Sequence, residues 1–409
     1  MRLGGAFLLG LGVTATALAF GSRPLGVAGV GLLIAASAAR IWAGLVRGGV
    51  SVAFTALPAD AVEGDRVRVR VEALRSSRVP VGSVVAHGRL GRLGPFELRL
   101  RGHGRVAQGD LWLGRVPRGR FVLSDARIVL GDHLGLESIS RELDPGEFSV
   151  LVYPRLFDIE TLFSEAGRLG GQGRRLLLRR SAGFDLHSVR EYTEGESLRR
   201  VHWPTTARTG QLMVKELEDS PRDSVAVVLD CDPAGAAGEP PDSSFDAAVR
   251  AAGSVLRHHV GRARKATLVT TGRDAIAQSV SPGESEFGAA RGILAAAEPD
   301  ALHGIASWLR DLQRRAHDAG EIVIVTANLE PVVTEAILAT ATRRLVSVVW
   351  IDAPSYVGRP TRPAVGALRL AAQGIPVAVV RHGEDLAAAL GSPRAETRAE
   401  THAEAMSLG

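Results

Sequence analysis

The sequence predicts an α/β fold for the C-terminal half, namely a parallel sheet with helices on both faces, preceded by a β-sandwich domain and an N-terminal transmembrane helical hairpin. Three observations predict this organisation. Two long uncharged stretches open the chain, strict apolar–polar alternation follows, and the second half alternates short apolar runs with helical patterns. Because 409 residues exceed what a single core usually organises, we expect several domains.

The N-terminal residues form two apolar stretches. Residues 3–22 carry no charge, and residues 24–39 form a second uncharged stretch that Arg40 follows. A bilayer core requires about 20 apolar residues in a helix, so the first stretch is long enough. The second is long enough only if Arg40 extends to the headgroups. A cleaved signal peptide is the alternative, but the immediate second stretch favours an uncleaved pair of helices over residues 1–47.

The arginines around these stretches predict an orientation. Arg40, Arg47 and Arg66 all follow the second stretch, whereas Arg23 alone lies in the connecting turn. Because basic residues accumulate on the cytoplasmic side of a membrane, we expect both ends of the chain in the cytoplasm. The prediction is a multi-pass protein of a bacterial cell membrane with the bulk of the chain cytoplasmic.

Residues 48–156 show the period of two that half-buried strands have. Arginine alternates with valine over residues 66–71, and residues 96–101 alternate again. Shorter apolar runs occupy residues 126–130 and 149–153, with Gly and Pro between the runs. Several short strands at this spacing predict a small β-sandwich-like domain that serves as a spacer or an interaction module.

Composition excludes some classes of protein. The net charge is only +5, with acidic residues nearly matching basic ones, so no nucleic-acid-binding surface is predicted. The single cysteine, Cys231, excludes an internal disulfide framework and a cysteine-rich zinc site.

Residues 157–222 contain a glycine-rich linker and a dense polar motif. The linker holds Gly-x-x-Gly-Gly-x-Gly, but no strand precedes it, so a phosphate loop is not predicted. In the motif we expect a short helix that Pro204 ends or bends, then a turn at Thr209 and Gly210 before a new apolar segment. The candidate binding residues are Arg190, Glu191, Tyr192, Gly195, Arg199, Arg200, His202, Trp203 and Arg208.

Two interpretations of this motif stay open. Guanidinium groups beside carboxylates and aromatic rings either form a fixed ion-pair network or bind an anionic ligand or a partner. His202 beside Trp203 has the chemistry of a general base, but no serine or cysteine nucleophile stands in a recognisable setting. We therefore expect a structural hydrogen-bonding role for His202.

Residues 190–216, R-E-Y-T-E-G-E-S-L-R-R-V-H-W-P-T-T-A-R-T-G-Q-L-M-V-K-E, resemble the signature of the domain of unknown function 58 family. Glu196 stands where that family commonly has Asp, and residues 204–206 replace Lys-Ala-Ser-like residues. The resemblance implies two membrane segments, a β-rich middle and a von Willebrand factor A-like half. It also implies association with MoxR-type AAA+ ATPases, and often with transglutaminase-like membrane proteins, but no established activity.

Residues 223–390 alternate strand and helix patterns. Continuous apolar runs indicate strands buried on both faces, which is typical of a parallel sheet wrapped by helices. The expected strands are residues 225–229, 266–270, 322–325, 345–351 and 377–380. The expected helices are residues 245–261, 284–296, 301–319, 331–342 and 364–373. Residues 391–409 contain few apolar residues, and we expect a disordered tail.

Polar residues follow several of these strands, where α/β folds bind ligands. Asp230, Asp232, Thr326, Asn328 and Asp352 are expected on one rim. In A-type domains the first strand ends in D-x-S-x-S, whose oxygens hold a divalent ion. Here Ala234 replaces the last serine, so we expect no complete adhesion-type site. The candidate is a partial Mg²⁺ site of Asp230, Asp232 and Asn328, and the alternative is that the aspartates cap loops or helices.

The sequence is compatible with two functions. The first is a non-enzymatic binding or scaffold protein that acts with an AAA+ ATPase in the assembly or maturation of envelope or other protein complexes. The second is a hydrolase of an anionic substrate that uses the Arg/His/Trp motif or the aspartate rim. The sequence favours the scaffold, because it shows no nucleophile–base pair, complete metal set or cofactor loop.

Overall fold

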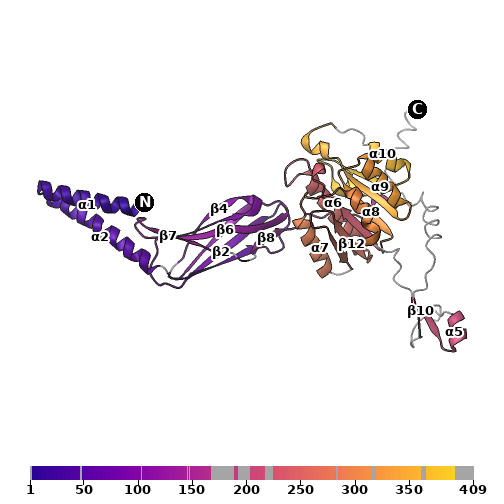
Figure 1. Cartoon of the computed structure of the whole chain (residues 1–409), viewed down its shortest axis with the longest axis horizontal. Coiled ribbons are helices and arrows are strands. Elements are labelled where there is room, and N and C mark those ends of the chain that lie inside the picture. The colour runs from indigo at the N-terminus through magenta and orange to yellow at the C-terminus, as the bar shows by residue number, and fades with distance from the viewer. Residues whose placement is uncertain are drawn as a thin grey trace. The chain divides into compact units, whose positions relative to one another are not determined.

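The structure is a computed structural model, and it divides the chain into two compact units, Met1–Tyr153 and Pro154–Gly409 (Figure 1). It describes residues 2–46, 48–102, 104–144, 146, 148–166, 188–191, 203–216, 224–281, 284–315, 319–360 and 365–391. The expected disordered tail lies outside the described residues, apart from Gly391.

The first unit begins with two antiparallel helices, α1 (Arg2–Phe20) and α2 (Arg23–Leu45). Gly21, with φ +65°, makes the turn between them, and Pro24 occupies the first turn of α2, where its missing N–H is not needed. Gly29 lies against Thr14 so closely that a Cβ there would meet the Thr14 backbone. Small residues therefore bring the two helices close together.

Length and composition distinguish the two helices. Among the described residues, α2 alone is long and apolar enough to cross a membrane, whereas the apolar part of α1, Gly4–Phe20, is shorter. One membrane-crossing helix is thus supported by length and composition, and a crossing by both helices stays a prediction.

Two antiparallel sheets complete the first unit. One has the strand order β1-β2-β5, and the other has the order β4-β3-β6-β7, with β8 also paired to β6. The strands are β1 (Val50–Leu57), β2 (Arg66–Arg75), β3 (Ser83–Leu90), β4 (Pro95–Leu100), β5 (Val106–Arg115), β6 (Gly119–Gly131), β7 (Ser138–Glu142) and β8 (Ser149–Val152).

Strand β2 shows why alternation predicts a strand. Val67, Val69 and Val71 are fully buried, while the arginines between them point to the other face. The buried side chains of both sheets form one cluster, which also includes Val46 just after α2. Trp42 of α2 packs against this cluster, and its indole Nε1 donates a 2.7 Å hydrogen bond to the carbonyl oxygen of Pro80.

The second unit is built on a six-stranded sheet with the order β13-β12-β11-β14-β15-β16. Five strands are parallel, as predicted, but the edge strand β13 is antiparallel to β12 and was not expected. The strands are β11 (Val225–Leu229), β12 (Ala266–Thr270), β13 (Ile276–Val280), β14 (Glu321–Thr326), β15 (Leu345–Ile351) and β16 (Val377–Val380).

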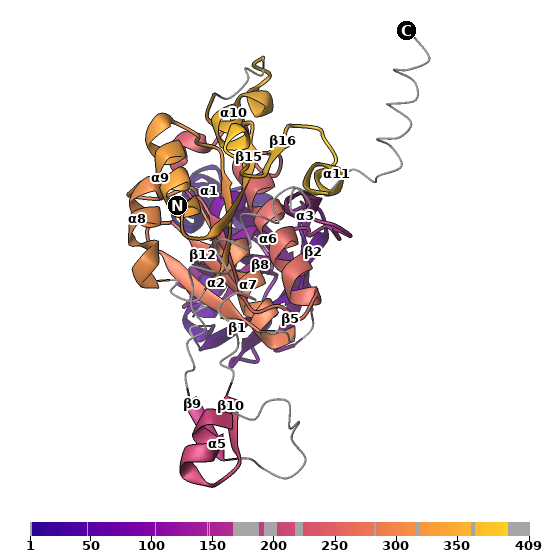
Figure 2. The same cartoon turned by 90° about the vertical axis from the view of Figure 1, so that its right-hand side faces the viewer.

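Helices cover both faces of this sheet, as expected (Figure 2). They are α3 (Phe163–Ala166), α6 (Ser244–Gly261), α7 (Glu284–Ala296), α8 (Ile305–Arg315), α9 (Pro331–Ala341), α10 (Val365–Ala372) and α11 (Leu386–Leu390). The helix expected over residues 301–319 is shorter, because α8 begins only at Ile305. Helix α6 begins with a capping box in which Ser243 and Asp246 bind each other's backbone N–H groups.

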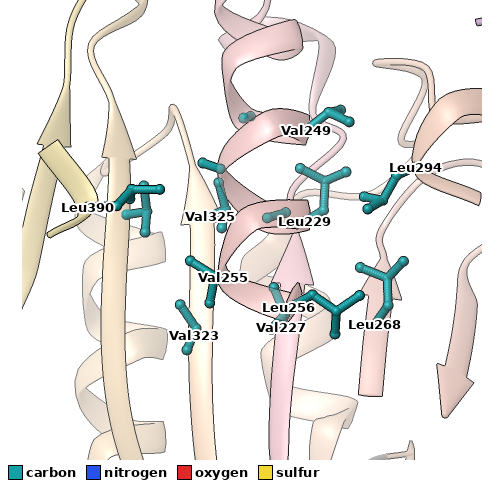
Figure 3. Close-up of a cluster of buried hydrophobic side chains, with 14 of the residues drawn as sticks. Val227, Leu229, Val249, Val255, Leu256, Leu268, Leu294, Val323, Val325 and Leu390 are labelled. Carbon is teal, nitrogen blue, oxygen red and sulfur yellow. The ribbon is translucent and has the colours of Figure 1, made fainter. Parts of the chain in front are cut away.

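The continuous apolar runs serve two cores. Val227 and Leu229 of β11 pack with α6 on one face, whereas Ala226 and Val228 pack with α8 and α9 on the other. Figure 3 shows the first core, where Leu229 of β11 lies near Val249 of α6 and Leu294 of α7. A strand buried on both faces requires apolar residues at every position, which explains why the alternation seen in β2 is absent from β11.

Candidate functional site

The order of the sheet identifies where a ligand would bind. From β11 the chain passes outward to β12, and it later returns to the other side of β11 at β14. Open α/β sheets bind ligands beyond the carboxyl ends of the strands where the order reverses in this way. Asp230 and Asp232 follow β11, while Thr326 ends β14 and Asn328 follows it. The structure therefore brings these four predicted residues together.

Asp230 is the centre of a hydrogen-bond network at this point. Its side chain is buried, and Oδ2 accepts a 2.6 Å hydrogen bond from the hydroxyl of Thr326. Oδ1 accepts from the backbone N–H of Asp232 at 3.2 Å and from the hydroxyl of Thr271 at 3.4 Å. The Thr271 hydroxyl oxygen also accepts from the N–H of Cys231 at 2.9 Å. Each carboxylate oxygen of Asp230 thus accepts at least one hydrogen bond from the protein.

Thr271 was not among the site residues predicted from the sequence. Its signal was available, because Thr271 is a polar residue directly after an apolar run that was correctly predicted as a strand. Strand β12 neighbours β11 in the parallel sheet, so polar residues after these two strands meet at the same edge.

Burial perturbs the acidity of Asp230. Desolvation is the largest effect and raises the pKa of its carboxyl to about 6. The hydrogen bond from Thr326 lowers this pKa, whereas the neighbouring charge of Asp232 raises it. This carboxyl therefore gains its proton close to neutral pH, unlike an ordinary aspartic acid.

Asp232 has the role of a cap. Its Oδ1 accepts a 2.9 Å hydrogen bond from the N–H of Ala234 and so begins the short 3₁₀ helix Pro233–Gly235. The amide Nδ2 of Asn328 donates to Oδ2 of Asp232 at 3.4 Å and ties the two loops together. The loops approach so closely that a Cβ at Gly235 would lie 2.8 Å from the Cβ of Ala327.

The hydrogen bonds of Asp230 and Asp232 involve the same oxygens that were predicted to bind Mg²⁺. Among the described residues, no three His, Cys, Asp or Glu side chains are grouped as a metal ion requires. Magnesium prefers six oxygens in octahedral geometry, but Asp230 and Asp232 already accept hydrogen bonds and Ala234 offers no side-chain oxygen. The set Asp230, Asp232 and Asn328 does not fit a magnesium ion in this arrangement, and the capping alternative describes Asp232.

Asp352 belongs to a different group of residues. It follows β15 and is 1% exposed, and its Oδ2 lies 3.7 Å from Nε of Arg381. Its backbone carbonyl oxygen accepts a 2.7 Å hydrogen bond from the hydroxyl of Ser355, so Asp352 contacts Arg381 and Ser355. Asp352 thus follows its strand at the same edge of the parallel sheet as Asp230, as expected, but its contacts are with other residues.

The motif around residues 190–216 is described in part. Strand β9 (Ser188–Glu191) pairs antiparallel with β10 (Met213–Glu216), which places Arg190 opposite Val214 and Glu191 opposite Met213. The predicted site residues Tyr192, Gly195, Arg199, Arg200 and His202 lie outside the described residues.

Helix α5 spans Trp203–Thr209, and Pro204 is its second residue, where a proline ring costs no backbone hydrogen bond. The short helix that Pro204 was expected to end or bend precedes Trp203 and lies outside the described residues. The expected turn at Gly210 is confirmed, with φ +73°, and the apolar segment after it is β10.

The helix and the hairpin form one small assembly. The hydroxyl oxygen of Thr206 on α5 accepts a 3.0 Å hydrogen bond from the N–H of Met213 on β10. Trp203 is 63% exposed and Leu212 is 41% exposed, and Arg208 is also exposed. Tryptophan and arginine supply much of the binding energy in protein interfaces, so a short helix that exposes both residue types is suited to binding a partner.

Three further side chains of types that act in catalysis, Cys231, His258 and His259, are buried in the fold. Burial raises the pKa of Cys231 to about 12, so its thiol is protonated and not nucleophilic at neutral pH. On α6, Nδ1 of His258 lies 2.7 Å from the carbonyl oxygen of Ile159, and Nδ1 of His259 lies 3.0 Å from NH1 of Arg264. Both imidazole rings are thus in contact with neighbouring groups of the fold.

Comparison with known proteins gives one family and one distant relative. The uncharacterized protein YeaD of Bacillus subtilis (strain 168) is 27% identical over 221 residues, which is 53% of this chain and 52% of YeaD. The chain thus spans about half the length of the curated relative it matches.

Solved structures match only weakly. Cwp6 from Clostridium difficile is 10% identical and covers 73% of this chain and 37% of its own, with a TM-score of 0.20. A β-glucosidase from Listeria innocua in complex with glucose is 11% identical over 24% of this chain and 16% of its own, with a TM-score of 0.14. Scores this low carry no argument about fold or function.

Residues 188–375, from β9 through α10, match the family described as protein of unknown function DUF58.

Proposed function

We propose that this protein is a membrane-anchored, cytoplasm-facing binding or scaffold protein that acts with a MoxR-type AAA+ ATPase in the assembly or maturation of envelope or other protein complexes. The observation that carries the proposal is the exposed side chain of Trp203 on α5, a helix that also carries exposed Arg208. The polar rim at Asp230, by contrast, is satisfied by its own threonines. A transglutaminase-like membrane protein is a second candidate partner.

The anchor supports this proposal. No acidic residue precedes Asp60, and α2 has the length and hydropathy of a membrane helix. We propose that α1 and α2 both cross the membrane, with Arg23 in the outer turn. The basic residues after α2 then place the remainder of the chain in the cytoplasm.

The fold supports it as well. The strand order 3-2-1-4-5-6 counted from β11, with helices on both faces, is the order of doubly wound α/β domains. We propose that the second unit is von Willebrand factor A-like with an incomplete adhesion site, and that the two sheets of the first unit are a β-sandwich. A domain of this kind without a complete metal set is suited to binding a partner through side chains elsewhere.

Co-purification tests the proposal. The full chain and a MoxR-type ATPase from the same genome would be co-expressed, solubilised in detergent and captured through a tag on the chain. We expect the ATPase to co-purify and Trp203→Ala to reduce the captured amount at least ten-fold. Trp112→Ala is a matched control, because Trp112 on β5 is 64% exposed and Trp203 is 63% exposed. Absence of the ATPase from the wild-type capture, or equal loss in both variants, would contradict the proposal.

A hydrolase is the second candidate, and one observation favours it. Asp230 has a pKa near 6 and lies where the strand order reverses, and a carboxyl that titrates near neutral pH is suited to proton transfer. Hydrolysis of a panel of phosphate and carboxylate esters by the full chain tests it. Turnover lost in Asp230→Asn would establish the hydrolase, and no turnover in the wild type would end this alternative.

A further inference from the structure

The surface of the helical hairpin carries an open groove of about 470 Å³. The groove lies where the start of α1 meets the last third of α2. Apolar atoms dominate its lining, and it holds a single charged side chain, that of Arg40. The lining residues are Gly4, Phe7, Ala36, Ser37, Arg40 and Ile41.

Among the described residues, no carboxylate forms an ion pair with Arg40. The chain contains no aspartate or glutamate before Asp60, so neither helix offers a carboxylate. The side chain of Arg40 is exposed, and no ion pair or hydrogen bond joins it to the residues that the structure describes. Ser37 lies one helical turn before Arg40 on the same face and adds a hydroxyl donor. An unpaired guanidinium at a membrane helix requires an anion from outside the chain.

The position of Arg40 indicates which anion is available. Arg23 and Arg40 are separated by roughly 25 Å along α2 at 1.5 Å per residue, close to the thickness of a hydrocarbon core. Two residues after Arg40, Trp42 donates its indole hydrogen bond to Pro80, at the edge of the β-rich part of the unit. Tryptophan favours the headgroup level of a bilayer, so Arg40 lies at the depth of the lipid phosphates.

We propose that this groove binds an anionic phospholipid, with the headgroup phosphate on Arg40 and an acyl chain along Phe7 and Ile41. The inference rests on the proposed membrane anchoring. Phe7 is 45% exposed and Ile41 is 64% exposed, and both line the groove together with Arg40. Because the site holds one positive charge and no negative one, it prefers a lipid of net negative charge over a zwitterionic lipid.

Tryptophan quenching by brominated lipids tests the proposal on the full chain. The chain has five tryptophans, and Trp42 is the one within the apolar helices, so lipid quenching reports on the neighbourhood of Arg40. The protein would be reconstituted in phosphatidylcholine vesicles with a small fraction of brominated phosphatidylglycerol or of brominated phosphatidylcholine. We expect the wild type to prefer brominated phosphatidylglycerol about five-fold, and Arg40→Gln to lose this preference.

Two further variants make the result specific. Arg40→Lys keeps a positive charge and should retain most of the preference, whereas Arg23→Gln removes a charge at the other end of α2 and should leave it unchanged. Equal quenching by both lipids in the wild type, or an unchanged preference in Arg40→Gln, would overturn the lipid site while leaving the anchor intact. Quenching by neither lipid would overturn the anchor, and the lipid site with it.

Discussion

The hydroxyl of Thr326 donates a 2.6 Å hydrogen bond to Oδ2 of Asp230 and so joins the ends of β14 and β11. These are the two neighbouring strands between which the order of the sheet reverses. Both partners are nearly inaccessible to solvent, so each supplies a polar atom that the other requires. Nearby loops depend on the same pair, since the Thr326 hydroxyl oxygen also accepts from the N–H of Asn328.

Replacement of Thr326 tests this relationship. Thr326→Val keeps the volume but removes the donor, which leaves Oδ2 of Asp230 buried with one partner fewer. We expect the free energy of unfolding to fall by about 1–3 kcal/mol and the pKa of Asp230 to rise further above 6. Thr326→Ser, which retains the hydroxyl, is the control. Denaturant titration of the full chain in detergent gives the stability, and equal stability of both variants would refute the role of the hydroxyl.

The pKa of Asp230 predicts a pH dependence of stability. Its folded-state value of about 6 exceeds the ordinary value of 3.8, so the native state binds this proton more tightly than the unfolded chain does. The protonated carboxyl of Asp230 therefore contributes roughly 3 kcal/mol to the stability of the folded state. This contribution is complete below pH 3.8 and is lost as the pH rises to about 6.

The measurement is a difference between two proteins. The stability of the wild type minus that of Asp230→Asn should fall between pH 4 and pH 6 and stay constant above that range, because the amide does not titrate. A difference that does not change over this range would show that Asp230 titrates normally.

Glu165 of α3 predicts the opposite pH dependence. Burial alone would raise the pKa of its carboxyl, but hydrogen bonds from His258 and Arg262 outweigh burial and hold the pKa below its usual value. The contribution of Glu165 to the stability of the folded state is therefore present above the ordinary pKa of 4.5 and is lost as the pH falls. Its Oε1 lies 2.6 Å from NH1 of Arg262, so α3 is held on α6 by this contact.

Hydrogen exchange measures that attachment. Glu165→Gln should accelerate amide exchange in residues 154–166 several-fold at neutral pH, because the ion pair with Arg262 is lost. Glu335→Gln is the matched control, since Glu335 pairs with Arg369 at 3.7 Å with its side chain 66% exposed. Acceleration of the same size in both variants would contradict a specific role for Glu165.

Calorimetry with Mg²⁺ tests the conclusion about the rim. Because Asp230 and Asp232 already accept hydrogen bonds from the protein, we expect the wild type and Asp230→Ala to give the same featureless isotherm. Ca²⁺ titration under the same conditions controls for a larger cation. A saturable wild-type isotherm that Asp230→Ala abolishes would restore the metal site.

The C-terminal sheet was largely predictable because its residues obey a local rule. Residues 225–229 and 345–351 were predicted with the boundaries that β11 and β15 have, since strands buried on both faces are apolar at every position. The edge strand β13 was missed because its residues 276–279 are exposed or half-exposed, so no buried run marks it.

The candidate site was predictable only in part, because its contacts join distant residues. The positions of Asp230 and Thr326 after their strands are visible in the sequence, but the hydroxyl of Thr271 meets Asp230 only through the neighbouring strand β12. In the motif, a proline is compatible with the first turn of a helix as well as with its end, so the residue type at position 204 does not decide between them.

The burial of Cys231 has a practical consequence. Its thiol is 1% exposed and stays protonated in any physiological buffer, so the native chain should not react with maleimides. A cysteine introduced in the turn at Ser22 or on β7 at Ser138 would then be the sole labelled site of the protein. Labelling of intact cells with a membrane-impermeant maleimide would reach Ser22→Cys but not Ser138→Cys if the turn lies outside and the sheets lie inside.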